Sequence, residues 1–197
     1  KLISDQDDTA GGNINVNAAI SSNGGTVQFI GDVVNVNSGG VVTTHGLTST
    51  GNIAVEANDL FIDVGAGAVL DTSQGISNGN ILIRTRFNNQ SQNISLGYAT
   101  AVAGTLSIET NEFTNGLNTG DNKGNVVIGS GSHQGDITVG GQVVSFAIND
   151  FEAYTLGDFV FDQNGPGINL AGKNVSINAG SIVTSLAAGA NADITAA

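Results

Sequence analysis

The chain has 197 residues, of which 40% are hydrophobic and only 11% charged, with 29 glycines, a single proline and no cysteine, methionine or tryptophan. Five basic side chains against seventeen acidic ones give a formal net charge of −12, which repels nucleic acid and anionic lipid and argues against both as partners. Without cysteine the chain has no disulfide framework and no thiolate for catalysis or zinc, and no apolar run reaches the ~20 residues of a membrane helix.

Residues 1–10 are polar and acidic, and we expect them to form a lead-in to the folded part of the chain. Asp5, Asp7 and Asp8 supply the oxygen density that Ca²⁺ prefers, but the segment lacks the Gly-Gly-x-Gly-x-Asp nonapeptide of a calcium-binding β-roll. A flexible lead-in is therefore favoured over a calcium site. We expect no other metal site and no cofactor.

From residue 11 onward the sequence repeats a pattern of glycine, then Asn, Thr or Asp, then two apolar residues separated by one other residue. Alternation of apolar with other residues is the period of a β-strand with one buried face, and glycine and asparagine tolerate the positive φ that tight corners require. No stretch keeps the apolar spacing of a helix. The copies begin at Gly12, Gly25, Gly51, Gly79, Gly104, Gly124, Gly135 and Gly157.

Such a unit cannot bury its apolar face alone and must stack on copies of itself. Equivalent apolar positions recur about twenty residues apart, as in the steps from Ile14 to Val34 and from Val34 to Ile53. This period predicts an all-β fold, a single parallel β-solenoid over residues 11–197 with coils of about 20 residues and a few loop insertions.

Stacked corners bring equivalent side chains into line, so we expect Asn52, Asn80 and Asn125 to form a ladder. Two polar segments, residues 84–95 and 114–124, are predicted to be loops that leave the coil. The printed sequence stops partway through another copy of the unit. Because an uncovered solenoid edge favours aggregation, we expect the solenoid to continue into further repeats or to dock on them.

Residues 143–161 hold five of the ten aromatic side chains and follow the repeat least well. We expect either an irregular coil of larger cross-section or a lateral hairpin there. Phe146, Phe151 and Tyr154 form the candidate ligand-contact cluster, because aromatic rings supply a large contact area for a sugar or a protein. Filling of the core by the same rings is the simpler interpretation.

Acidic pairs are the candidates for acid–base chemistry, since β-helical enzymes that cleave polysaccharides place carboxylates on adjacent coils. The pairs are Asp150 with Glu152, Glu109 with Glu112, and Asp59 with Asp63. The basic partners that a lyase needs are scattered along the chain, so we expect solvated carboxylates and no catalytic residue. His45 and His133 have no ligand at a metal-binding spacing and are predicted to be surface or corner residues.

One family resemblance rests on two of these motifs. Gly-Asn-Ile-x-Val at residues 51–55, followed by apolar-x-Val-x-x-Gly-Ala-x-(Val/Leu)-x-Thr at residues 62–72, resembles the β-helical repeats of filamentous haemagglutinin-like exoproteins. These are large adhesins and toxin stalks that Gram-negative bacteria export by two-partner secretion. The resemblance covers most of residues 11–197 and is weak at 84–95 and 141–166. It implies a right-handed parallel β-helix, secretion to the cell surface and no cofactor.

The sequence therefore predicts a non-catalytic structural and adhesive segment of a secreted bacterial cell-surface protein. The expected partners are a receptor or glycan on a host or neighbouring cell, or further copies of the chain. Two alternatives stay open. The chain could be a subunit of an extracellular filament assembled end to end, or a carbohydrate-active β-helical enzyme.

Overall fold

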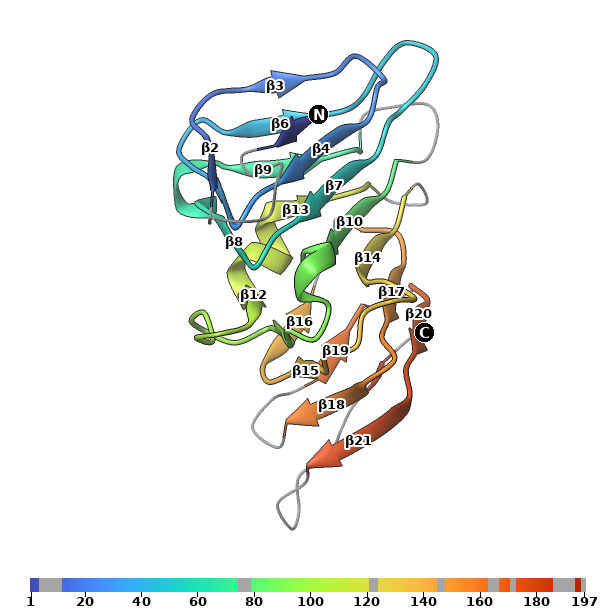
Figure 1. Cartoon of the computed structure of the whole chain (residues 1–197). Helices are drawn as coiled ribbons and strands as arrows, with labels where there is room; N and C mark the ends of the chain where they lie inside the picture. Colours follow the sequence, from blue (N-terminus) through green and yellow to red (C-terminus); the bar gives the residue numbers. More distant parts are fainter. Residues whose placement is uncertain are drawn as a thin grey trace.

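The computed structural model describes residues 1–3, 12–73, 79–120, 124–144, 148–162, 167–170, 173–185 and 194–195. Over these ranges the chain is almost entirely β-strand, arranged in five sheets whose strands pair in parallel (Figure 1). The strands follow one another down the molecule in Figure 1, from the N-terminal end at the top to the C-terminal strands at the bottom. The predicted all-β class with parallel stacking is confirmed.

One seven-stranded sheet runs the length of the molecule, and we call it the long sheet. Its order is β1 (Leu2–Ile3), β4 (Val27–Ile30), β7 (Ile53–Glu56), β10 (Ile81–Arg84), β14 (Val126–Gly129), β17 (Phe151–Tyr154) and β20 (Val175–Asn178). The sheet begins before the predicted boundary at residue 11, because Leu2 and Ile3 already pair with Phe29 and Ile30. Residues 4–10 of the expected lead-in, including the acidic cluster, lie outside the described residues.

The other strands form two further faces, each divided into two sheets. One face contains β2 (Asn13–Val16), β5 (Val33–Val36) and β8 (Asp59–Ile62), then β12 (Leu106–Ile108), β11 (Ile94–Leu96), β15 (Ile137–Val139), β18 (Asp158–Asp162) and β21 (Ser181–Ser185). The other contains β3 (Ile20–Ser21), β6 (Val41–Thr43), β9 (Val69–Asp71) and β13 (Leu117–Asn118), then β16 (Gln142–Val144), β19 (Gly167–Asn169) and β22 (Ile194–Thr195). The chain visits the three faces in turn, except that β11 and β12 follow one another on the same face, and this order is compatible with a solenoid.

The pairing register differs from the predicted coil length. Val34 pairs with Leu60 and not with Ile53, which belongs to the long sheet. Hydrogen-bonded partners on successive levels lie 20, 26, 28 or 45 residues apart. Corners of variable length cause this spread, and one of them is the tight turn closed by the antiparallel bridge between His45 and Thr50. The predicted step from Ile14 to Val34 is confirmed, the step from Val34 to Ile53 is wrong, and the longer intervals occur as expected for loop insertions.

In the interval of 45 residues between Asn80 and Asn125 the chain forms two successive strands, β11 and β12, on the same face. After β10 come the 3₁₀ turn η2 (Phe87–Asn89), β11, β12, the π-helical turn η3 (Glu112–Gly116) and β13. Strand β11 inserts between β12 and β15 and pairs with both. The predicted loops at 84–95 and 114–124 thus contain regular structure, which their polar composition concealed. A shorter 3₁₀ turn, η1 (Val64–Ala66), joins β8 to β9.

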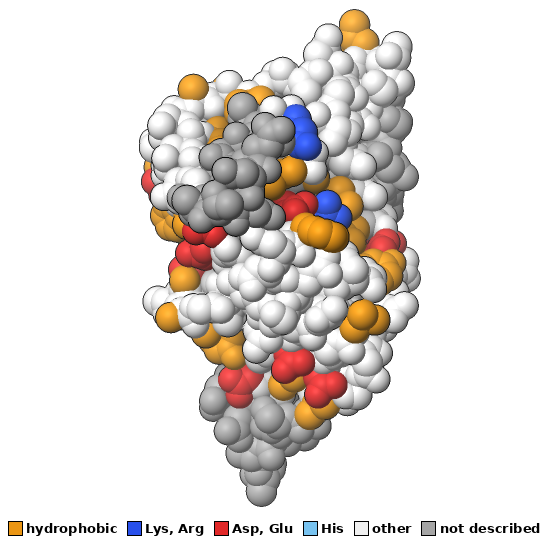
Figure 2. Space-filling model, in the orientation of Figure 1, with side chains coloured by type: hydrophobic (Ala, Val, Ile, Leu, Met, Phe, Trp, Pro, Cys, Tyr) orange, Lys and Arg blue, Asp and Glu red, His pale blue; other side chains and the backbone are white. Residues whose placement is uncertain are grey.

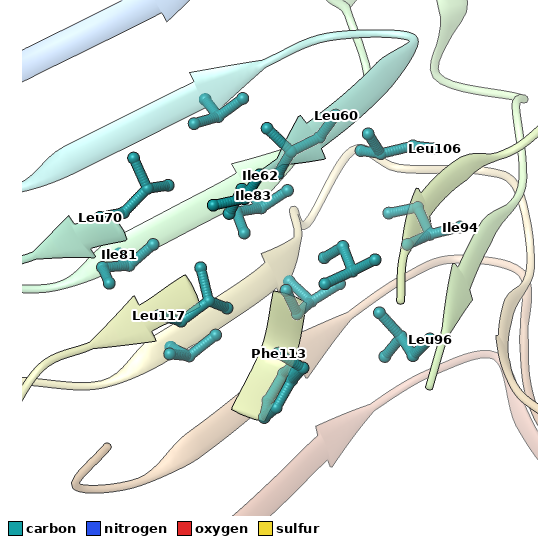
Figure 3. Packing of buried hydrophobic residues seen from close by; sticks show 14 of the residues in the cluster. Leu60, Ile62, Leu70, Ile81, Ile83, Ile94, Leu96, Leu106, Phe113 and Leu117 are labelled. Carbon is teal, nitrogen blue, oxygen red and sulfur yellow. The ribbon is translucent and has the colours of Figure 1, made fainter. Parts of the chain in front are cut away.

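The core is filled by the apolar residues that alternate along each strand. In β4, for example, Val27 and Phe29 are buried while the residues between and after them are not. Figure 3 shows aliphatic side chains from different sheets converging around Phe113, with Leu70 and Leu117 entering from neighbouring strands. Within the described part of 143–161, β17 and β18 continue the parallel stack, so a lateral hairpin is not formed there.

Two features hold the stack in register. Asn52, Asn80 and Asn125 align in a ladder as predicted, but the expected amide-to-amide bonds are replaced by bonds to the backbone: Asn80 N donates to Asn52 Oδ1, and Asn125 N donates to Asn80 Oδ1, both at 2.9 Å. The repeated glycines are needed for two reasons. Gly104 has the predicted positive φ, 78°. At Gly124 close backbone approach requires glycine instead, because an added Cβ would collide with the carbonyl of Gly79.

Candidate functional site

The predicted ligand-contact cluster does not share one surface. Phe151 is fully buried, with its ring centroid 5.9 Å from that of Phe113, and it fills the core. Tyr154 lies on the opposite face of β17, where its hydroxyl donates a 2.7 Å hydrogen bond to Glu152 Oε2, and this bond is the main cause of its raised pKa. Phe146 lies outside the described residues.

Asp150 and Glu152 hold neighbouring strands together. Asp150 Oδ1 accepts the backbone N–H of Asn174 at 2.9 Å, and its Oδ2 accepts the side-chain amide of the same residue at 3.1 Å. Glu152 Oε1 accepts the side-chain amide of Asn125 at 2.5 Å. Both carboxylates therefore act as hydrogen-bond acceptors along the long sheet.

The other two predicted pairs meet at one place. Asp63, Glu109 and Glu112 line a pocket of about 130 Å³ beside the partly exposed ring of Phe61, and we call this the acidic pocket. The pocket lies where the face that contains β8 and β12 is divided into two sheets. Strand β8 contacts β12 there but does not pair with it. Asp59 lies on the same strand as Phe61. Burial raises the pKa of Asp59, and the charge of Glu109 adds to the effect.

Glu112 is the most enclosed of these carboxylates, with only 3% of its surface exposed. Its Oε1 accepts the backbone N–H of Ile62 at 2.6 Å, and its Oε2 accepts the backbone N–H of Glu109 at 2.9 Å. Burial raises the pKa of Glu112 to about 7, helped by the charges of Glu109 and Asp59. A carboxyl with this pKa suits acid–base chemistry, but both of its oxygens bind backbone amides in this fold.

A second pocket, of about 80 Å³, lies where the parallel strands β7, β10 and β14 reach their carboxyl ends, and we call it the corner pocket. Figure 2 shows acidic, basic and hydrophobic side chains meeting near the middle of the face that it draws. The residues that line it are Glu56, Arg84, Thr85, Phe87, Gln90, Ser130 and Ser132.

The corner pocket is built on an ion pair. Arg84 donates to Glu56 Oε2 through Nε at 3.2 Å and through Nη2 at 3.0 Å. The second oxygen, Oε1, accepts the backbone N–H of Phe87 at 3.0 Å. Glu56 is 11% exposed and Arg84 46%, so the acid is enclosed while the guanidinium faces solvent.

Sequence reasoning missed the corner pocket, because it assigned Arg84 and Phe87 to a polar loop. The available signal was a single aromatic residue among polar neighbours immediately after a strand. Glu56, which completes the site, is 28 residues from Arg84 in sequence, and only the pairing of β7 with β10 brings the two together.

The histidines do not form a metal site. His133 lies in the corner between β14 and β15, one of the two kinds of position predicted, where it is buried and its Nδ1 lies 3.2 Å from Thr85 Oγ1. Burial lowers the pKa of His133 and so favours the neutral imidazole. Within the described ranges, no group of three or more His, Asp or Glu side chains is placed to hold a metal ion. The proposed calcium ligands Asp5, Asp7 and Asp8 lie outside those ranges.

None of the helices in the described part of the chain is long and apolar enough to cross a membrane. No protein-family model, curated protein or solved structure matches the chain.

Proposed function

We propose that this chain is a structural and adhesive segment of a secreted bacterial cell-surface protein, built as a right-handed parallel β-helix and performing no chemistry of its own. The observation that carries the proposal is the long sheet, whose seven strands pair without interruption from β1 at one end to β20 at the other. Interior strands of such a sheet have their backbone groups paired on both sides, and they resist local opening. Stiffness along the stacking direction is the property that a surface shaft needs.

The side chains singled out for chemistry support the same proposal. Asp150 and Glu152 link strands of the long sheet, and Glu112 binds two backbone amides. A carboxylate that already accepts hydrogen bonds inside the fold is held in one orientation by them, and turning it toward a substrate would break those bonds. This cost favours structural roles for these acids.

Two measurements on the purified chain test the proposal. Fluorescently labelled chain is expected to bind saturably to the surface of cultured epithelial cells or of bacteria. Incubation with neutral and acidic polysaccharides is expected to release no reducing ends and no unsaturated products. Cleavage that disappears in Asp150→Ala, Glu152→Ala or Glu112→Gln would establish the carbohydrate-active enzyme instead, and an absence of cell binding at ~10 μM would refute the adhesive role.

A filament subunit is the second candidate, and one observation favours it. Ile182 of β21 is 57% exposed, although it pairs in register with Phe159, which is fully buried. In the described residues β21 has a paired neighbour on one side only. An inward-facing apolar residue on such an edge offers both backbone and side-chain contacts to a further parallel strand.

Sedimentation velocity combined with negative-stain microscopy distinguishes the filament from the monomeric segment. A filament subunit would form species that grow with concentration, because a head-to-tail contact does not close on itself. Ile182→Asp would shorten them by placing a charge in the contact. A monomer throughout the micromolar range would exclude the filament and leave the shaft proposal in place.

A further inference from the structure

The corner pocket combines an exposed aromatic ring with a neutralised set of hydrogen-bonding groups. Phe87 is 78% exposed, which makes it the most exposed aromatic residue reported for the described ranges. Its ring stands at the rim of a cavity of about 80 Å³ whose other walls are polar. A volume of this size encloses only a small chemical group, so a ligand would lie against the ring and insert one substituent.

The ring is held by a rigid support. The backbone N–H of Phe87 binds Glu56 Oε1 at 3.0 Å, and the side-chain amide of Asn89 donates to Asn58 Oδ1 at 2.9 Å. The carbonyl of Gln90 accepts the backbone N–H groups of Gln134 at 2.8 Å and Gly135 at 3.0 Å. The turn η2 is thus fixed to strands on both sides. Little backbone entropy is lost when a ligand contacts a ring carried by a turn that is fixed in this way.

The polar wall offers donors and acceptors with little net charge. The Glu56 carboxylate compensates the Arg84 guanidinium, which stays 46% exposed and retains donors beyond the two hydrogen atoms that it gives to Glu56. The Gln90 amide donates to Ser132 Oγ at 3.1 Å, and Ser130 Oγ lies 3.2 Å from the same hydroxyl. An amide and two hydroxyls exchange donor and acceptor roles readily, as sugar hydroxyl groups do.

Charge favours a neutral ligand over charged ones. The net charge of −12 disfavours a polyanion, and the exposed Arg84 guanidinium disfavours a cation. A pyranose ring has an apolar face of C–H groups for the Phe87 ring and a rim of hydroxyls for the polar wall. A peptide side chain could also contact the ring. The peptide's backbone amides would then need hydrogen-bond partners, and the pocket is too small to enclose those amides.

We propose that the corner pocket binds a neutral saccharide, with one sugar face stacked on Phe87 and the sugar hydroxyls hydrogen-bonded to Arg84, Gln90 and Ser132. The inference deepens the proposed function and rests on its adhesive part, for which it names the ligand class. It needs no chemistry from the chain, since the saccharide is bound and not altered.

Saturation-transfer NMR with the intact chain tests the proposal. The probes are glucose, galactose, mannose, N-acetylglucosamine and their β-linked disaccharides. At least one probe is expected to receive saturation on its ring C–H protons with millimolar affinity, as a single stacked ring predicts. Phe87→Ala should weaken that binding about ten-fold, and Ser132→Ala about three-fold. Because Phe87 is mostly exposed and its backbone N–H is retained, the variant should keep its fold, which the amide spectrum verifies.

Phe61→Ala is the matched control, since it removes another partly exposed phenylalanine that lines the acidic pocket. Its saccharide binding should equal that of the unmodified chain. The proposal is overturned if no probe receives saturation at ~50 mM, if Phe87→Ala binds as well as the unmodified chain, or if Phe61→Ala loses binding equally. Cell binding that survives Phe87→Ala would overturn this site alone, whereas polysaccharide cleavage would overturn the non-catalytic function.

Discussion

The Glu112 carboxylate hydrogen-bonds the backbone of Ile62, a residue on the edge of strand β8 and 50 positions earlier in the chain. The Ile62 N–H, which would point to a neighbouring strand in a continuous sheet, donates instead to Glu112 Oε1 at 2.6 Å. One side chain therefore replaces a missing strand where β8 and β12 fail to pair. Because the Glu112 carboxyl is titratable and buried, the contact between β8 and β12 is sensitive to pH.

The stability of the fold should decrease as pH rises from mildly acidic to neutral. Burial first, and then the charges of Glu109 and Asp59, raise the pKa of Glu112 from 4.5 to about 7. Between these values the folded chain binds more protons than the unfolded chain, so the free energy of unfolding falls as pH increases. We expect a loss of about 1–3 kcal/mol between pH ~4.5 and pH ~7.5, measured by urea denaturation.

Glu112→Gln provides the control for this pH effect. It removes the titration but keeps one acceptor oxygen, so its stability should be lower at pH ~5 and should vary less with pH. Glu152→Gln, an acid outside the core, should retain the slope of the unmodified chain. An equal slope in Glu112→Gln and in the unmodified chain would contradict the assignment.

Close backbone stacking should make Gly124 intolerant of any side chain. A Cβ there would collide with the carbonyl of Gly79, and backbone cannot move aside cheaply. We expect Gly124→Ala to lower the free energy of unfolding by about 2–4 kcal/mol. Gly131→Ala is the control, because an added Cβ at Gly131 meets nothing within 4 Å, and its effect should stay within ~0.5 kcal/mol. Similar losses in the two variants would show that stacking is not the cause.

The Asn ladder should depend on the acceptor oxygen and not on the amide. Asn80 Oδ1 accepts the backbone N–H of Asn125, so Asn80→Ala leaves that donor without its partner. We expect a loss of about 1–2 kcal/mol in thermal or urea unfolding. Asn80→Asp keeps an oxygen at the same place and should recover most of the stability. If aspartate is as damaging as alanine, the hydrogen bond is not the stabilising contact.

The two described members of the predicted ligand cluster should respond in opposite ways to mutation. Phe151→Ala removes a fully buried ring packed on Phe113 and should cost about 3–5 kcal/mol in urea denaturation. Tyr154→Phe removes only a hydroxyl that binds Glu152 on the outer face, and should cost less than ~1 kcal/mol. A small loss for Phe151→Ala would show that the ring does not fill the core.

The sequence by itself determined the strands, their buried faces and their parallel stacking. Alternation of apolar residues and a glycine at each corner are local signals, and they fix which side of a strand such as β4 faces the core. The Asn ladder was also predictable, because equivalent corners must align once strands stack. The length of each coil was not predictable, because corners differ in length and strand pairing sets the register. The pairing of Val34 with Leu60 is an example.

Only the tertiary structure decided which polar side chains meet. Glu112 reaches Ile62 at the place where β8 and β12 lie side by side without pairing, and no local pattern encodes that interruption of the face. Glu56 meets Arg84 because β7 and β10 pair in one register, and the resulting ion pair positions Phe87 at the rim of the corner pocket. Contacts between distant segments depend on how strands pair across levels, which the composition of each segment does not specify.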